Sequence, residues 1–306
     1  MFKLALHSVS YAGVWPGQTR LSWEQFIVKA VRLGFEAVML MAKRPHLSLL
    51  DIGPATRREV KRFADGHGLK VAVVAGYNDF GAGSEVPDVP LREMQVYYIG
   101  ELARLAADLG CSVVRVFTAF ERDGVPYQSA WENTVSCLRE AARRAADFGV
   151  TLGVQNHHDL AVHHASLADL LAEIDEPNCK ACFDAWAHAP AAQADSEFRQ
   201  DGPNLAAAVK ALAPHLVHTT VADYVHRPRY QYQPALVNYV RTVDTLRAVP
   251  MGEGFLDYRS FFQALTEIGY TGYVAYEMCS PVRGGGGEQN LDSCAGKFLG
   301  YMKRWS

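Results

Sequence analysis

Four strand-like segments of the sequence end in, or contain, a residue that can bind a metal ion or carry a proton. Apolar runs of this kind are typical of buried parallel strands, and a polar side chain at the end of one is costly unless it has a partner. The residues are Gln155 with His157 and His158 in VTLGVQNHH, Asp184 at the end of KACFD, His218 within LVHTTV and Glu277 at the end of YVAYE. We therefore expect them to share a pocket at one end of a barrel.

A repeated junction indicates how these residues are positioned. A helical pattern ends in glycine and a strand-like run follows at once, because glycine adopts the left-handed conformation that ends a helix without a steric clash. The junctions contain Gly34, Gly68, Gly110, Gly149 and Gly269. With the other apolar runs, they predict strands at residues 3–8, 36–41, 70–75, 112–117, 150–155, 180–184, 215–221 and 272–277.

Eight strands that alternate with helices favour a (β/α)₈ TIM barrel of the α/β class, as a single domain over residues 1–306. A doubly wound open sheet is the alternative. That fold usually carries the motif G-x-G-x-x-G after its first strand, and the segment HSVSYAGVWPG does not match it. The sequence also predicts a long loop after the seventh strand, from ADYVHRPRYQYQP to Asp257.

The composition excludes several classes of protein. A net charge of −3 with neutral histidines argues against a nucleic-acid binder. No apolar run reaches the roughly 18 residues of a membrane helix, and we read no signal peptide at the N-terminus. The only C-x-x-C, Cys179 with Cys182, lies in an apolar strand, which favours buried structural thiols over a zinc or redox site. We therefore expect a cytoplasmic protein.

The chemistry of the strand-end residues suits a divalent cation. Imidazole, carboxylate and amide oxygen together form a borderline-hard set of donors, which fits Mn²⁺, Mg²⁺, Co²⁺ or Zn²⁺ better than copper. Such an ion would bind a ketone oxygen and a neighbouring hydroxyl together and polarise the carbonyl. A base could then remove the adjacent proton to give an enediolate.

These segments resemble the xylose isomerase-like TIM barrels, a superfamily of sugar isomerases, keto-sugar 3-epimerases and inosose-processing enzymes. The resemblance rests on GVTLGVQNHHD, ACFDAWAH, HTTVAD and GYTGYVAYE, with MGEGFLDYRSFFQAL before the last strand and AKRPH at 42–46. It implies a divalent metal, with Mn²⁺ the first expectation, held by Gln155, Asp184, His218 and Glu277. It also implies that Glu277 is a catalytic base.

The chain departs from the epimerase branch at one position. The family has glutamate at the end of the fifth strand, where this chain has Gln155. Glutamine can still bind a metal through oxygen, but it cannot take up a proton near pH 7. Epimerisation by two opposed bases would therefore need His157 or His158 as the second base, since histidine titrates near neutrality.

These residues are consistent with three functions, of which we prefer the first. The first is a metal-dependent isomerase or epimerase that acts on a keto-sugar or a cyclic keto-polyol (inosose) through a metal-bound enediolate. The second is a lyase, a dehydratase or a C-glycoside-deglycosylating subunit that acts on a 3-keto sugar by the same chemistry. The third is a non-catalytic sugar-binding barrel. An endonuclease IV-like repair enzyme would need a richer metal cluster and a basic face.

The residues that follow the expected strands are candidates for substrate binding, because polyols need many hydrogen-bonding groups. They are Lys43, Arg44, His46, Tyr77, His158, Trp186, His188, Asp223, Arg229 and Glu253. The expected partner is a small sugar or polyol, with neither nucleic acid nor a membrane. By analogy with other barrels we expect a dimer or tetramer of this chain, or a complex with a small partner subunit.

Overall fold

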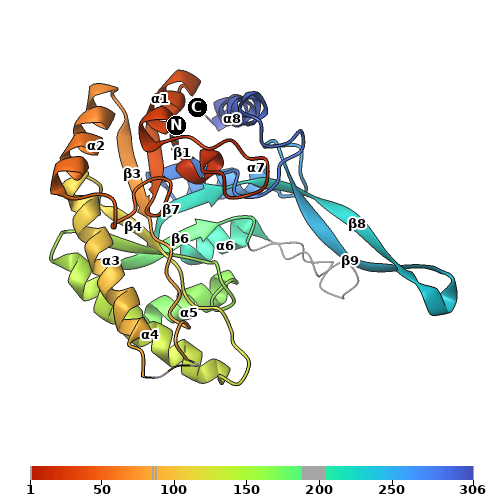
Figure 1. The fold of residues 1–306 in the computed structure, drawn as a ribbon, viewed down its shortest axis with the longest axis horizontal. Coiled ribbons are helices and arrows are strands. Elements are labelled where there is room, and N and C mark those ends of the chain that lie inside the picture. The colour runs from red at the N-terminus through yellow and green to blue at the C-terminus, as the bar shows by residue number, and fades with distance from the viewer. Residues whose placement is uncertain (1, 85, 87, 188–203, 306) are drawn as a thin grey trace.

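Eight parallel strands close into a barrel in the order β1-β10-β7-β6-β5-β4-β3-β2 (Figure 1). The computed structural model describes residues 2–84, 86, 88–187 and 204–305. The barrel predicted from the sequence is confirmed, and every predicted strand is present. The strands are β1 (Lys3–His7), β2 (Ala37–Met41), β3 (Lys70–Ala75), β4 (Val113–Val116), β5 (Thr151–Gln155), β6 (Cys179–Asp184), β7 (Leu216–Val221) and β10 (Tyr273–Tyr276).

The helices cover the outside of the barrel (Figure 1). The predicted junction glycines all adopt positive φ angles, and Gly34 ends the first helix with a φ of 94°. The α-helices are α1 (Trp23–Leu33), α2 (Pro54–Gly66), α3 (Leu91–Asp108), α4 (Tyr127–Ala146), α5 (His164–Ile174), α6 (Leu205–Leu212), α7 (Tyr258–Glu267) and α8 (Glu288–Met302). Short 3₁₀ turns are η1 (Ser8–Tyr11), η4 (Pro234–Leu236) and η5 (Lys303–Trp305).

Alternation along the strands decides which side chains face the barrel interior. Ala5, Met39, Val73 and Ala275 belong to a small buried cluster that contains residues of β1, β2, β3 and β10. The residues between them, such as Leu6, Leu40 and Val74, pack into the large core that the helices share. The same period places Arg115, Gln155, Asp184, Thr220 and Glu277 on the inner side, because Val116, Val154, Phe183, Val221 and Tyr276 face outwards.

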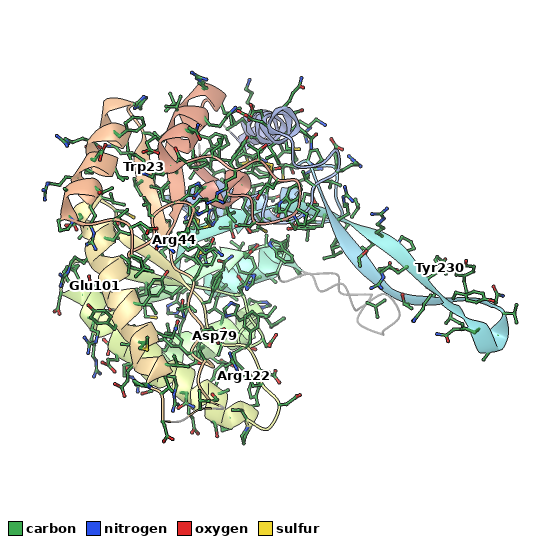
Figure 2. All side chains as sticks on the ribbon, viewed as in Figure 1. Trp23, Arg44, Asp79, Glu101, Arg122 and Tyr230 are labelled. Atoms are coloured by element: carbon green, nitrogen blue, oxygen red, sulfur yellow. The ribbon has the colours of Figure 1, made fainter. Side chains whose placement is uncertain are left out.

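The segment after β7 differs from the predicted long loop. It forms an antiparallel hairpin of β8 (Asp223–Gln233) and β9 (Asn238–Val249), which extends away from the barrel (Figures 1 and 2). Tyr230, labelled in Figure 2, is 63% exposed. The sequence pattern gives no sign of this hairpin. Most residues in the part of the hairpin far from the barrel are exposed on both faces, so no apolar run marks its strands.

Within the described residues, no helix is both long and apolar enough to cross a lipid bilayer.

Candidate active site

Three of the predicted residues meet at the carboxyl ends of β5, β6 and β10. The Nε2 atom of Gln155 donates a hydrogen bond to Oδ2 of Asp184 at 2.7 Å. Asp184 and Glu277 are both buried, and their carboxylates are close enough for the charge of Glu277 to raise the pKa of Asp184. We call Asp184 and Glu277 the carboxylate pair.

The pKa values of the carboxylate pair are both raised, mainly by burial. Burial raises the pKa of Asp184 well above its usual value, and the charge of Glu277 adds to this effect. Burial also raises the pKa of Glu277, but the guanidinium of Arg115 opposes the shift, as do contacts from Trp186 and Cys279. Two coupled carboxyl groups release their protons in two separate steps, so one of them can act as a base while the other still holds a proton.

Asn156 holds the end of β6 in place. Its side-chain Oδ1 accepts a hydrogen bond from the backbone N–H of Asp184 at 2.6 Å, and its Nδ2 donates to the backbone oxygen of Asp184 at 3.0 Å. Asn156 is fully buried, so this clamp fixes where the Asp184 carboxylate points. The sequence analysis missed Asn156, although its place directly after Gln155 was a usable signal.

Replacing Asn156 by alanine should destabilise the fold by about 2–4 kcal/mol, because two buried backbone groups lose their partner. Chemical denaturation would measure the loss. Asn178, which directly precedes β6 and donates to the backbone oxygens of Ala142 and Val150, offers a matched control. Its alanine variant should lose stability without changing the environment of Asp184. Equal stability of the Asn156→Ala variant and the native chain would contradict the clamp.

His218 lies in the same register as Gln155, because both residues pair with Cys182 of β6. On the neighbouring strands His218 pairs with Cys182, two residues before Asp184, and with Tyr273, four residues before Glu277. Thr220 is level with Asp184 instead, and its hydroxyl accepts a hydrogen bond from Gln155 at 3.3 Å. Burial, followed by the charge of Arg115, lowers the pKa of His218 to about 3.

The donors available to the predicted divalent ion are two buried carboxylates, an amide and a buried imidazole. Gln155 directs an N–H donor at Asp184, and the buried Nε2 of His218 has no hydrogen-bond partner among the described residues. The part of the chain that the structure describes contains no group of three or more His, Cys, Asp or Glu residues able to hold a metal. The expected set of Gln155, Asp184, His218 and Glu277 stays a prediction.

A Gln155→Glu variant should bind Mn²⁺ at least about tenfold more tightly than the native chain. The change replaces an amide beside Asp184 with a third carboxylate, and hard cations prefer anionic oxygen ligands. Calorimetric titration with MnCl₂ would measure it, with Gln155→Asn as the control that keeps an amide. Equal affinities of the native chain and the Gln155→Glu variant would contradict the placement of this side chain beside Asp184.

His157 and His158 lie between aromatic rings at the end of β5. The His157 ring is 4.7 Å from Phe117, and the His158 ring is 3.8 Å from Phe120, measured between centroids. Burial first and then neighbouring positive charge lower the pKa of His157 to about 4 and that of His158 to about 3. The backbone N–H of His158 donates to Nδ1 of His157 at 2.8 Å. The neutral His157 ring therefore carries its proton on Nε2, as a donor.

Arg115 is the largest omission of the sequence analysis. It lies on β4, faces the interior and is only 2% exposed. Its guanidinium carbon stands 3.9 Å from the centre of the Phe117 ring and 4.8 Å from that of Tyr77, and the ammonium of Lys43 is 3.8 Å from the Tyr77 ring centre. The signal was available, since a charged residue interrupts the apolar run SVVRVF.

Trp186 also lies beside the carboxylate pair. Its ring is 4.9 Å from that of Tyr224 and meets the ring of His157 edge-on at 6.4 Å. Tyr77, His157 and Trp186 thus supply a donor and aromatic surface around the carboxylate pair, and Lys43 lies over the Tyr77 ring. Such a wall suits the apolar face of a sugar ring and its hydroxyls.

Other predicted substrate residues are engaged elsewhere. Arg44 forms a bidentate ion pair with Asp51, and His46 bonds Ser8 and Leu21 in the loops above β1 and β2. Asp223 accepts the backbone N–H groups of Gly252 and Gly254, so it organises the turn after β9. Glu253 pairs with Arg283 and Lys297, and Arg229 lies on the exposed hairpin. His188 lies outside the described residues.

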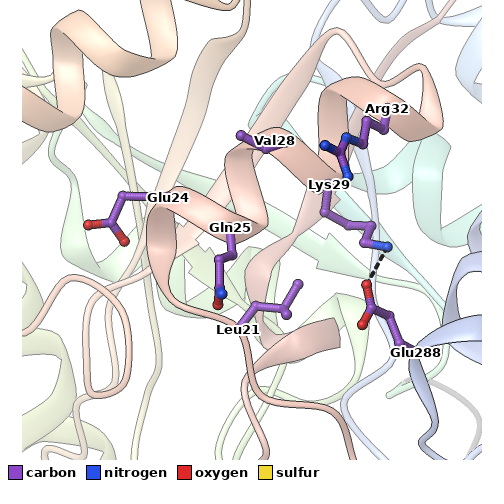
Figure 3. Close-up of a pocket in the computed structure, with 7 residues that line it drawn as sticks. All are labelled: Leu21, Glu24, Gln25, Val28, Lys29, Arg32 and Glu288. Atoms are coloured by element: carbon purple, nitrogen blue, oxygen red, sulfur yellow. Dashed lines mark ion pairs between the residues drawn. The ribbon is translucent and has the colours of Figure 1, made fainter.

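A separate pocket of about 400 Å³ lies on the helical shell, against α1 and α8 (Figure 3). Within it, Lys29 pairs with Glu288 at 2.6 Å, and also with Asp292 of α8 at 2.6 Å. It shares no residue with the carboxylate pair and its surroundings. Asp79 and Arg122, labelled in Figure 2, form another ion pair of 2.7 Å between the loops after β3 and β4.

Comparison with known proteins decides the family. The model of the xylose isomerase-like TIM barrel family matches residues 27–294, which is most of the chain. The chain belongs to this family. The family resemblance predicted from the strand-end motifs is therefore confirmed. A search of curated proteins found no match.

Solved structures support the same fold for this xylose isomerase-like barrel. A D-psicose 3-epimerase from Clostridium cellulolyticum H10, solved with D-tagatose, has a TM-score of 0.72 and 18% identity, over 99% of this chain and 98% of that chain. A 3-keto-D-glucoside 4-epimerase from E. coli scores 0.69 at 18% identity, over 99% and 100%. A probable 3-DHS dehydratase from Bacillus anthracis scores 0.69 at 17%, over 98% of each chain. At 17–18% sequence identity, this structural similarity establishes the fold alone.

Proposed function

We propose that this barrel is an enzyme that moves a proton beside the carbonyl group of a keto-sugar or cyclic keto-polyol, as an isomerase or epimerase. The observation that carries the proposal is Glu277, a buried carboxylate at the barrel mouth whose pKa is raised by burial. A raised carboxylate pKa brings a base closer to neutral operating pH. Structural neighbours of this fold include sugar epimerases.

The proposed step begins with ionised Glu277. Its carboxylate takes a proton from the carbon next to the substrate carbonyl, and the electron pair of that C–H bond moves to the carbonyl oxygen. The Nε2–H of His157 is a donor for a substrate oxygen. Glu277, now protonated, returns the proton to a carbon of the enediolate, and the site at which it does so decides the product. One base is enough for this sequence.

A second function is favoured by Asp184. Burial and the charge of Glu277 both raise its pKa, so Asp184 can hold a proton beside an ionised Glu277. A protonated acid beside a base can donate to a leaving β-hydroxyl while the base removes the α-proton, which releases water and gives an enone. The neighbour from B. anthracis carries the name of a dehydratase. We place this elimination second because isomerisation needs only the base.

Deuterium exchange tests the proposal. The purified chain should be incubated in D₂O with D-fructose, D-allulose, D-tagatose and a set of inososes, and deuterium at the carbon next to the carbonyl should be followed by NMR. Incorporation with recovery of a keto-sugar supports the isomerase, and a new enone absorbance supports the elimination. A chain that binds a sugar and exchanges nothing would be the binding barrel.

Association remains a prediction. A dimer, a tetramer or a complex with a small partner subunit is proposed by analogy with other barrels. Analytical ultracentrifugation of the purified chain would measure the state of self-association.

A further inference from the structure

The β8–β9 hairpin carries three tyrosines on one face. Tyr232 lies opposite Tyr239 in the antiparallel pairing, and Tyr230 precedes Tyr232 by two residues. Residues that are opposite each other or two apart share a face of a sheet. The three side chains are 48–66% exposed, and the rings of Tyr232 and Tyr239 are 5.4 Å apart between centroids. Leu236 and Val237, at the tip of the hairpin, are also exposed.

An exposed hairpin of this kind needs a partner surface. A two-stranded sheet is only marginally stable in water on its own, and an apolar surface surrounded by polar residues marks an interaction site. The opposite face is mainly polar, with Gln231, Gln233 and Asn238. Pro228 and the register shift beside it make β8 a poor edge for an added strand. The hairpin therefore offers a face, rather than an edge, to its partner.

The hairpin is also basic. From Val225 to Val243 the sequence contains three arginines and neither aspartate nor glutamate, and two of the arginines, Arg227 and Arg229, are exposed near the barrel end of β8. Because the hairpin is a single sheet, charges on both of its faces act on a surface that it lies against, within a screening length of about 8 Å at physiological salt. The surface that fits it is therefore acidic and carries exposed aromatic groups.

Such a surface lies on the same chain, at the loops after β3, β4 and β5. Oδ1 of Asp79 accepts the backbone N–H of Phe120, and Oδ2 of Asp159 accepts that of Glu121, so the three loops are joined. The acidic rim, as we call this surface, consists of Asp79, Phe120, Glu121, Asp123, Tyr127 and Asp159. Its members other than Asp79 are exposed, and Arg122 between them pairs with Asp79.

The hairpin cannot cover the acidic rim of its own chain. It follows β7, which stands opposite β3 in the closed barrel and three strands away from β4. In Figure 2, Asp79 and Arg122 lie far from Tyr230, and the hairpin extends away from them. A second copy of this chain brings the two surfaces together.

We propose that two copies of this chain associate through the hairpin, which lies across the acidic rim of the other copy. The tyrosine face packs on Phe120 and Tyr127 of the second copy, and Arg227 and Arg229 lie close to its carboxylates. Tyrosine and arginine are enriched among the residues that stabilise protein interfaces. A twofold axis makes the contact reciprocal, so each dimer contains it twice. The inference does not depend on the proposed function.

Sedimentation velocity of charge-reversal variants tests the inference. The native chain should be a dimer at micromolar concentration. Arg227→Glu with Arg229→Glu reverses the charge of the hairpin, and Glu121→Lys with Asp123→Lys reverses that of the acidic rim. Each double variant should raise the dissociation constant of the dimer by at least about 100-fold, because like charges then face each other. An equal mixture of the two double variants should form a dimer again, since each hairpin then meets a rim of opposite charge.

Tyrosine substitutions test the apolar part of the contact. Tyr230→Ser with Tyr232→Ser should raise the dissociation constant by at least about tenfold. Tyr97→Ser removes a tyrosine of α3 that is 65% exposed, as Tyr230 is 63% exposed, and it serves as the matched control that dimerises like the native chain. Circular dichroism shows that each variant is folded. A monomeric native chain, a hairpin or rim charge variant that dimerises like the native chain, or a mixture that stays monomeric would each overturn the inference.

Discussion

Glu277→Gln should lower deuterium exchange by about 10³-fold or more, while the fold stays intact. The substitution keeps the shape of the side chain, but an amide cannot accept the α-proton, and a positioned general base contributes about 10²–10⁴-fold to such a step. The change also removes one negative charge from the carboxylate pair, so it does not add an unpaired anion to the barrel. NMR of the sugar in D₂O measures the rate, and thermal denaturation checks the fold.

Glu267→Gln is the control for this substitution. Glu267 ends α7, on the outer shell, and pairs with Lys210 at 2.7 Å. Its glutamine variant should exchange deuterium at the native rate. A Glu277→Gln variant that retains full exchange would remove Glu277 from the role of base and would move the proton transfer to another group.

The barrel could be predicted because its physical causes are local. An apolar run that follows a helix-ending glycine is a property of a few neighbouring residues, and it marked β2, β3, β4, β5 and β10 before any contact was known. The carboxylate pair followed from the same pattern, since Asp184 and Glu277 end two such runs. Burial and parallel pairing then bring the ends of the strands to one face.

The depth of each side chain in the barrel could not be read from the sequence. His218 and Thr220 both face the interior at a spacing of two, and the sequence does not say which of them is level with Asp184. The pairing of β6 with β7 decides it, through a shift in register between Ala181 and Cys182. That shift depends on contacts between strands more than thirty residues apart in the chain.

In the loops, the sequence pattern led to the opposite error, since a residue expected in the pocket stabilises a turn instead. Asp223 looks like a pocket acid because it follows a strand, but two backbone N–H groups and the turn that contains Gly254 already satisfy it. A side chain at Gly254 would lie against the Asp223 carboxylate. Arg115 shows the reverse case, because a single charged residue inside the apolar run SVVRVF faces the barrel interior.

Asp184→Asn should stabilise the protein at neutral pH while it lowers activity. The Asp184 carboxylate is fully buried beside Glu277, and no ion pair compensates its charge among the described residues. The neutral amide removes that charge, and Gln155 can rotate its own amide to keep a hydrogen bond. We expect a gain of about 2 kcal/mol, and the melting temperature should rise by about 4 °C or more.

The dependence of this gain on pH identifies its cause. The pKa of Asp184 is raised in the folded state, so the folded chain binds a proton there more tightly than the unfolded chain, and the native protein loses stability as the pH rises through that pKa. The difference between the Asp184→Asn variant and the native protein should therefore be largest at about pH 8 and should shrink as the pH falls through the raised pKa toward the ordinary one. Thermal melts at a series of pH values measure it. A difference that is constant with pH would mean that Asp184 is not held as a buried and uncompensated acid. An Asp184→Asn variant that is less stable than the native protein at pH 8 would mean the same. In either case, the roles of acid and base within the carboxylate pair would be reversed or lost.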